Sequence, residues 1–186
     1  MEHFHYKIPG WFTFPSLYAW MASNYKVGHF VEVGSFLGNS AAYMAVEIIN
    51  SGNQIKFDCI DIWNRDTTKG LHLKEPLKYP EDLTYKLFLN NTEPVRNFIN
   101  PIRLDSLQAA QLYPDRSLDF VFIDANHDYE PVLADIHAWL PKIRTGGHIA
   151  GHDYMSDKQV KRAVDETFGR TFEGDHNENC WYYLVQ

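Results

Sequence analysis

One stretch, HFVEVGSFLGNS at residues 29–40, constrains the fold of this chain more than any other. The largely apolar residues 30–33 predict a buried strand, and Gly34 and Gly38 permit a tight turn that a Cβ would obstruct; residues 41–49 favour a helix. A strand, a glycine turn and a helix in this order leave unpaired backbone N–H groups at the helix N-terminus. The stretch therefore predicts an α/β fold with a small-molecule site above the strand.

The spacing of the glycines and one acidic residue narrow the class of ligand. A dinucleotide-binding turn has the pattern G-x-G-x-x-G, whereas this chain has E-x-G-x-x-x-G-x-S, which begins at Glu32 and ends at Ser40. A carboxylate beside the turn would repel a diphosphate group. We therefore expect a small ligand without a pyrophosphate, and a nicotinamide cofactor is disfavoured.

The composition limits the partners and the compartment. A chain of 186 residues has the length of one domain, and we expect a single domain. Its 17 basic and 24 acidic side chains give a net charge of -7, which disfavours nucleic acid and anionic membranes as partners. Two cysteines, Cys59 and Cys180, are too few for a disulfide framework, and no apolar run has the length of a membrane span. We expect a cytoplasmic protein.

Apolar runs alternate with segments of helical period, a pattern typical of βαβ units. It predicts a Rossmann-like doubly wound, mostly parallel sheet with helices on both faces and an antiparallel C-terminal hairpin. The expected strands are residues 29–33, 56–63, 101–105, 118–124 and 148–151, with a hairpin that ends at 181–185. The expected helices are 15–25, 40–50, 81–90, 94–97, 107–112, 130–140 and 157–168, with a turn at 145–147. Residues 64–80 lack periodicity, and we interpret them as a lid insertion.

Several polar residues come directly after the predicted strands, where open α/β sheets bind their ligands. Asp61 has the spacing from the glycine turn at which an acid takes both hydroxyls of a ribose, although a surface aspartate or a helix cap would look the same. Ile62 and Trp63 would flank an adenine, or Trp63 belongs to the core. Asp105 and Ser106 would contact the adenine edge, or form an ordinary N-cap pair.

A second group of polar residues follows the fourth and fifth strands. Asp124 and Asp153 offer oxygen ligands to Mg²⁺ or another divalent cation, and two solvated carboxylates are the alternative. His127, three residues after Asp124, has the chemistry of a base that accepts a hydroxyl proton, and an ordinary surface histidine is the alternative. His152 is a candidate metal ligand, second base or structural hydrogen-bond donor.

Five segments at the strand ends share their motifs with a known family. They read VEVGSFLGNS at 31–40, CIDIW at 59–63, IRLDS at 102–106, FVFIDANHDY at 120–129 and GGHIAGHDY at 146–154. Together they resemble class I S-adenosylmethionine-dependent methyltransferases, specifically the small metal-linked O-methyltransferase branch. The last two segments are most similar to a subgroup with macrocin-type sugar O-methyltransferases and cephalosporin hydroxylase-like proteins.

The resemblance implies roles for named residues. In such enzymes the glycine turn, here with Gly34 and Gly38, approaches the methionine part of the cofactor, and a serine matching Ser40 contacts its carboxylate. Asp124 and Asp153 match metal ligands of the family, with Asp124 also expected to contact the cofactor, and His127 stands where catechol-type relatives have a catalytic lysine. Glu32 suits the cationic end of this phosphate-free cofactor. Tyr154 replaces an asparagine that completes the metal site in catechol-type enzymes.

The expected function is therefore S-adenosylmethionine-dependent methyl transfer to a hydroxyl of a small acceptor, with a sugar among the candidates. The residues that would shape the acceptor pocket, 11–20 and 64–80, carry the weakest pattern in the chain. A non-catalytic cofactor-binding module and a nicotinamide-dependent oxidoreductase remain as alternatives, because a fold does not fix a function. The oligomeric state stays open, and exposed aromatic residues near the N-terminus would support a homodimer.

Overall fold

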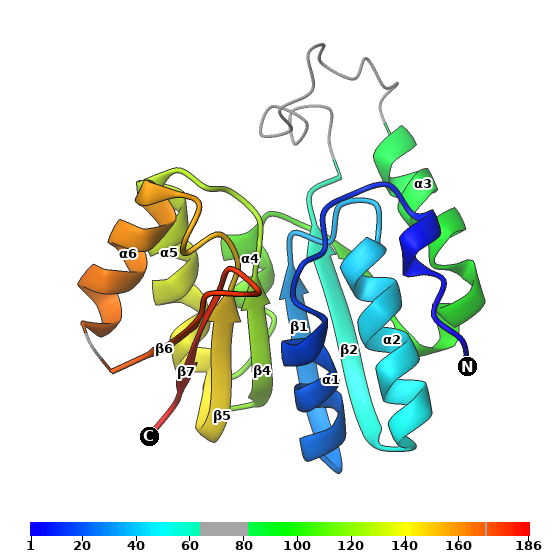
Figure 1. Ribbon diagram of the computed structural model, residues 1–186, viewed down its shortest axis with the longest axis horizontal. Coiled ribbons are helices and arrows are strands. Elements are labelled where there is room, and N and C mark those ends of the chain that lie inside the picture. Colours follow the sequence, from blue (N-terminus) through cyan, green and yellow to red (C-terminus); the bar gives the residue numbers. More distant parts are fainter. Residues whose placement is uncertain (64–81, 170) are drawn as a thin grey trace.

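The structure is a computed structural model that describes residues 1–63, 82–169 and 171–186. Its centre is a seven-stranded sheet with the strand order β3-β2-β1-β4-β5-β7-β6 (Figure 1). The strands are β1 (Val27–Val33), β2 (Gln54–Asp61), β3 (Asn100–Arg103), β4 (Leu118–Ile123), β5 (Ile143–Gly151), β6 (Glu173–Asp175) and β7 (Cys180–Leu184). The first five are parallel, and β7 runs antiparallel to both of its neighbours. The predicted fold class and the C-terminal hairpin are confirmed.

Helices cover both faces of the sheet (Figure 1). The α-helices are α1 (Pro15–Asn24), α2 (Asn39–Ser51), α3 (Leu83–Asn91), α4 (Ser106–Ala110), α5 (Tyr129–Trp139) and α6 (Lys158–Phe168). Short 3-10 helices are η1 (His5–Lys7), η3 (Glu93–Phe98) and η4 (Leu140–Lys142). One apolar core packs α1 and α2 on one face of the sheet, and a second core packs α5 and α6 on the other face. Alternate strand residues supply the two cores, since successive side chains of a strand point to opposite faces.

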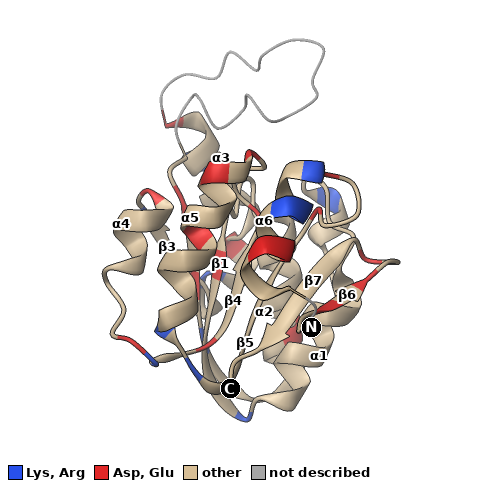
Figure 2. Cartoon of the chain, turned by 90° about the vertical axis from the view of Figure 1, so that its left-hand side faces the viewer, with Lys and Arg blue, Asp and Glu red and all other residues tan. Residues whose placement is uncertain are grey.

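The strand order places the ligand-binding edge of the sheet. From β1 the chain proceeds outward to β2 and β3, then crosses back to β4 on the other side of β1. The carboxyl ends of β1 and β4 therefore lie side by side where the order reverses, which is where open α/β sheets bind ligands. Acidic residues gather around the carboxyl ends of the central strands, whereas basic residues appear on α6 and on the loops at the opposite end (Figure 2).

The fifth strand begins earlier than the sequence predicted. The expected strand at 148–151 is the second half of β5, and the expected turn at 145–147 lies inside it. The pairing of β5 with β4 shifts there, because Leu118 pairs with Ile143 and Phe120 pairs with His148. Two steps along β4 therefore face five along β5, so the pairing is irregular at the glycine pair, and this segment resembles a turn in the sequence.

The remaining differences concern the ends of elements. β2 ends at Asp61, so Ile62 and Trp63 follow the strand, and β3 ends at Arg103, before Asp105. The predicted lid at 64–80 lies outside the described residues. No helix in the described part of the chain is both long and apolar enough to cross a membrane.

Candidate active site

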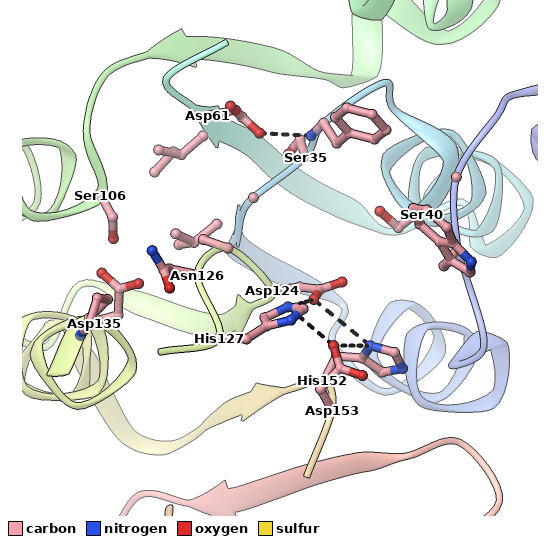
Figure 3. Close-up of a pocket in the computed structure, with 18 of the residues that line it drawn as sticks. Ser35, Ser40, Asp61, Ser106, Asp124, Asn126, His127, Asp135, His152 and Asp153 are labelled. Carbon is pink, nitrogen blue, oxygen red and sulfur yellow. Dashed lines mark hydrogen bonds and ion pairs between the residues drawn. The ribbon is translucent and has the colours of Figure 1, made fainter. Parts of the chain in front are cut away.

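A cleft with a volume of about 1240 Å³ opens at the carboxyl ends of the parallel strands. Figure 3 shows its polar side chains, which come from helices, strand ends and loops that are distant in sequence. Most of the predicted site residues line the cleft, namely Gly34, Ser40, Asp61, Ile62, Asp105, Ser106, Asp124, His127, His152 and Asp153. Glu32 and Gly38 are not among its lining residues.

The glycine turn is required by a close approach of two strand ends. Gly34 has a φ of +98°, and a Cβ on it would lie 2.0 Å from the carbonyl oxygen of Asp124. Gly38 has a φ of +88°, and a Cβ there would lie 2.6 Å from a methyl carbon of Thr92. Gly34 thus lets the ends of β1 and β4 meet below the cleft, whereas Gly38 lets the start of α2 pack against its neighbours.

Glu32 is buried beneath the turn, on the face of the sheet that α1 covers. Its Oε1 accepts a hydrogen bond of 2.8 Å from the hydroxyl of Tyr18, and its Oε2 has no hydrogen-bond partner among the described residues. Burial raises the pKa of the Glu32 carboxyl to about 7, although the hydroxyls of Ser35, Ser40 and Tyr18 act in the opposite direction. The buried hydroxyl of Ser35 likewise has no partner in the described part of the chain. Polar groups without partners beneath a glycine turn fit a ligand with a charged amino-acid end.

Asp61 holds the two loops beside it in place. One carboxylate oxygen accepts from the backbone N–H of Phe36 at 2.9 Å, and the other accepts from the N–H of Trp63 at 2.7 Å. The indole of Trp63 is fully buried against Tyr85, so this tryptophan is a core residue. Ile62 is 38% exposed and lines the cleft, as expected of a residue beside a base.

The side chains of Asp105 and Ser106 are engaged with protein groups. Asp105 is the N-cap of α4, where its carboxylate accepts from the N–H of Leu107 at 3.0 Å. The Ser106 hydroxyl accepts from the indole N–H of Trp139 at 2.9 Å. Of the two alternatives for Asp105, the structure shows the helix cap.

A buried carboxylate at this end of the cleft was not predicted. Asp135 lies on α5, is 5% exposed and lines the cleft. Burial raises its pKa to about 6, although the Ser106 hydroxyl acts in the opposite direction. A sequence signal existed, because Asp135 shares one helix face with the buried residues Val132, Ile136 and Trp139, where an acid is out of place.

Two aspartates and two histidines meet at the ends of β4 and β5 (Figure 3). His127 Nε2 lies 3.2 Å from Asp153 Oδ2 and 3.6 Å from Asp124 Oδ1. His152 Nδ1 lies 3.3 Å from Asp153 Oδ2 and 3.8 Å from Asp124 Oδ1. The four residues expected at neighbouring strand ends therefore lie together, and their roles in binding or catalysis stay predictions.

The electrostatics of this cluster follow from its mixed charges. Burial alone would raise the pKa of Asp153, but the neighbouring imidazole of His152 lowers it to about 2. The neighbouring carboxylate of Asp124, together with that of Asp153, raises the pKa of His127 against the effect of its partial burial. The carboxylates thus stabilise positive charge at this position, whether it belongs to an imidazolium or to a bound cation.

Residues from two distant segments orient the cluster. Thr13 Oγ1 lies 2.7 Å from His152 Nε2 and 3.3 Å from the carbonyl oxygen of Glu178, to which it donates. The threonine hydroxyl has one proton, so it accepts from a protonated Nε2, and Nδ1 of His152 faces the two carboxylates. The carboxylate of Glu178 accepts from the N–H groups of Ser16 and Leu17 at the start of α1. No local pattern in the sequence signals these contacts.

The C-terminal hairpin supplies an asparagine to the cluster. Tyr154, which stands at the family's asparagine position, points away and donates a hydrogen bond of 2.7 Å to Asp165 on α6. Asn179, in the connection between β6 and β7, donates from Nδ2 to Asp153 Oδ1 at 3.0 Å. Its Oδ1 accepts from the backbone N–H of Met155 at 2.7 Å, so this amide orients Asp153.

The donor set fits a divalent cation. Of the described residues, Asp124, His152 and Asp153 each offer one ligand atom, and these three atoms lie within 4.8 Å of one another. Two carboxylate oxygens and one imidazole nitrogen suit Mg²⁺ or Mn²⁺, and a ligating histidine characteristically donates its other N–H to a neighbouring oxygen, as His152 does to Thr13.

Comparison with known proteins identifies the relatives of this chain. It is 23% identical over 151 residues to the uncharacterized protein y4gI of Sinorhizobium fredii and 27% identical over 145 residues to the uncharacterized protein R132 of Acanthamoeba polyphaga mimivirus. These matches cover 81% and 74% of this chain, which spans 16% and 58% of the lengths of those relatives.

Solved structures share the fold at low sequence identity. The O-methyltransferase NovP has a TM-score of 0.67 at 17% identity, with 92% of this chain and 79% of NovP covered. Aeropyrum pernix fibrillarin, with natively bound S-adenosylmethionine, has a TM-score of 0.56 at 14% identity, with 91% and 74% covered. A family model described as a methyltransferase domain matches residues 31–154, from the glycine turn to the end of the His152 cluster. Since this match covers more than half of the sequence, the chain belongs to the methyltransferase domain family.

Proposed function

We propose that this protein transfers a methyl group from S-adenosylmethionine to a hydroxyl oxygen of a small acceptor, with a sugar as the first class to test. One observation carries the proposal. His127, a group able to accept a proton, lies beside Asp124 and Asp153 in the same cleft as the glycine turn. A cofactor site and a proton acceptor in one cleft meet the needs of methyl transfer to a hydroxyl.

The cofactor would lie across the switch point of the sheet. Its amino-acid end would lie at the glycine turn, near Ser40 and above the Oε2 of Glu32, which has no partner among the described residues. Its ribose would lie at Asp61, whose carboxylate is already oriented by the N–H groups of Phe36 and Trp63. This orientation is formed before binding, so little entropy is lost there when the ligand arrives.

The protein's contribution to the reaction would be positioning and proton transfer. When bound, S-adenosylmethionine supplies an electrophilic methyl group. The in-line displacement needs the acceptor oxygen to be held on the line of attack, and such positioning accounts for much of the rate in reactions of this kind. His127 would take the hydroxyl proton, and Asp124 and Asp153 would stabilise the imidazolium that results.

A divalent cation is part of the proposal. Asp124, His152 and Asp153 would hold it, and a bound cation would lower the pKa of a hydroxyl beside it and orient that hydroxyl. Chelation should abolish turnover, and addition of Mg²⁺ should restore it. Full activity in the presence of the chelator would show that the two aspartates act without a cation.

Two measurements test the proposed activity. Thermal unfolding is followed with S-adenosylhomocysteine and with NAD, and only the first should raise the melting temperature. Transfer of labelled methyl from S-adenosylmethionine is then measured with a panel of sugars, catechols and other small hydroxyl compounds. Stabilisation by NAD instead would support the oxidoreductase alternative, and binding of S-adenosylhomocysteine without transfer to any compound would support a non-catalytic module.

A further inference from the structure

Asp135 is a buried acid with no role in the proposed proton transfer or metal binding. It lies in the middle of α5, and its neighbours on that helix face, including Val132 and Ile136, belong to the apolar core. Burying a carboxylate costs free energy unless it gains a partner. The Ser106 hydroxyl accepts from Trp139, and its own proton is left for Asp135. The two carboxylate oxygens of Asp135 have about four lone-pair sites, so Asp135 can accept more hydrogen bonds than the Ser106 hydroxyl can donate.

The surroundings of Asp135 have the character of a pocket for a flat aromatic group. Apolar residues that line the cleft include Ile62, then Leu104 and Leu107, which flank Asp105 and Ser106 in sequence, and Pro131 and Ala134, which share α5 with Asp135. Figure 3 shows Ser106, Asn126 and Asp135 pointing toward one another there, at a distance from the His152 cluster. Apolar walls with a few convergent polar groups are typical of a ligand-binding subsite.

Among the described residues, Asp135 and Asn126 can offer an acceptor and a donor to a ligand at this end of the cleft. Asn126 Oδ1 accepts from the backbone N–H of Asp128 at 2.8 Å, so its NH₂ group remains available as a donor. Asp135 offers carboxylate oxygens from a buried position, whereas Asp105 is exposed and one of its two carboxylate oxygens already caps α4. The edge of an adenine presents an amino group beside ring nitrogens that accept hydrogen bonds, which complements this pair.

We propose that Asp135 is the residue that reads the exocyclic amino group of the cofactor's base and so makes the cleft specific for adenine. The inference rests on the proposed cofactor. Hypoxanthine differs from adenine at this position by an oxo group, which would place an oxygen against the carboxylate. A ligand that leaves a buried polar group of the protein without a hydrogen bond loses far more affinity than a ligand that differs slightly in shape.

The test compares the affinities of the chain for S-adenosylhomocysteine and for S-inosylhomocysteine, in which hypoxanthine replaces adenine, by calorimetric titration. The wild-type chain should bind the adenosyl compound about 10- to 100-fold more tightly. Asp135→Asn keeps the shape but can turn its NH₂ toward an oxo group, so this preference should fall by about tenfold or more. Asp128→Asn is the matched control, since it makes the same chemical change at an exposed position of the same cleft and should keep the wild-type preference.

The outcomes separate this inference from the proposed function. If the wild-type chain binds both compounds equally, or if Asp135→Asn keeps the full preference, the assignment of Asp135 is wrong while the cofactor assignment stands. If the wild-type chain binds neither compound, the cofactor assignment itself fails, and this inference fails with it. Asp135→Ser, which is smaller, provides the same comparison should the asparagine variant not fold.

Discussion

At the residue scale, the chemistry of the cleft depends on two properties of His127, namely its exposure and the carboxylates beside it. Its side chain is 42% exposed, and its ring nitrogen lies within 4 Å of two carboxylates. A proton acceptor needs access to the acceptor hydroxyl and a means to stabilise the charge that it gains. His127 has both, whereas His152, which is 9% exposed and bonded to Thr13, has the environment of an oriented ligand.

The first prediction concerns His127. His127→Ala should lower turnover by about 10²- to 10⁴-fold, because the hydroxyl proton then has no acceptor. The affinity for S-adenosylhomocysteine should stay close to that of the wild type. His137→Ala serves as the control, since His137 is an exposed histidine on α5 that does not line the cleft. An equal loss of turnover and of cofactor affinity would contradict the role of a base.

The second prediction concerns Thr13, which we place behind the proposed metal ligand His152. Thr13→Val removes the hydroxyl that fixes the His152 ring and should weaken Mn²⁺ binding by about 10- to 100-fold, measured by titration calorimetry. Thr13→Ser keeps the hydroxyl and should restore most of the affinity. A valine variant with unchanged Mn²⁺ affinity would show that the Thr13 contact has no part in metal binding.

At the element scale, segments far apart in the sequence complete each other. Helix α1 begins at Pro15 without a side-chain cap from its own N-cap residue, Phe14. Glu178, from the connection before β7, accepts from the N–H groups of Ser16 at 2.6 Å and Leu17 at 3.0 Å. The C-terminal hairpin therefore caps the first helix, and the negative charge also complements the helix dipole.

The third prediction follows from this contact. Glu178→Ala should lower the free energy of unfolding by about 1–2 kcal/mol, because two N–H groups of α1 lose their acceptor. Urea denaturation measures the change, with Glu173→Ala on the exposed part of the same hairpin as the control. A Glu178 variant as stable as the control would show that water replaces the cap without cost.

At the scale of the whole molecule, a buried polar network joins the parallel strands below the cleft. Asp58 of β2 is 1% exposed and accepts from His29 of β1 at 2.7 Å, from Asn100 of β3 at 2.9 Å and from the hydroxyl of Tyr113 at 2.8 Å. Burial alone would raise the pKa of Asp58, but these hydrogen bonds lower it below its usual value. The network thus favours the ionised carboxylate in the folded state.

The fourth prediction is the pH dependence that this network produces. A carboxyl with a lowered folded pKa stabilises the protein above its unfolded pKa of about 3.9, and the stabilisation is lost as the pH falls through the folded pKa. Asp58→Asn should therefore lower the free energy of unfolding at pH 7 by about 2 kcal/mol, and the difference from the wild type should shrink below about pH 4. Asp115→Asn, at an exposed aspartate, is the control. A difference that stays constant from pH 7 to pH 3 would contradict the lowered pKa.

The alternation of strands and helices and the residues at the strand ends follow from the sequence by itself. Hydrophobic periodicity is a local property, and parallel strands bring their carboxyl ends to one edge, so the sequence alone groups Asp124, His127, His152 and Asp153. The glycine turn is equally local, although the reason for Gly34, the carbonyl of Asp124 against it, is a tertiary contact.

Only the tertiary structure decided which polar side chains remain available to a ligand. The sequence left Asp105 and Trp63 with two roles each, and their hydrogen bonds and burial assign one to the cap of α4 and the other to the core. Thr13 lies in the stretch expected to shape the acceptor pocket, but its contact with His152, like that of Asn179 with Asp153, joins segments that are distant in sequence. The place of Asp135 in the wall of the cleft likewise depends on how α5 packs. Periodicity specifies which face of an element is apolar, whereas the partner of each polar atom depends on contacts between distant segments.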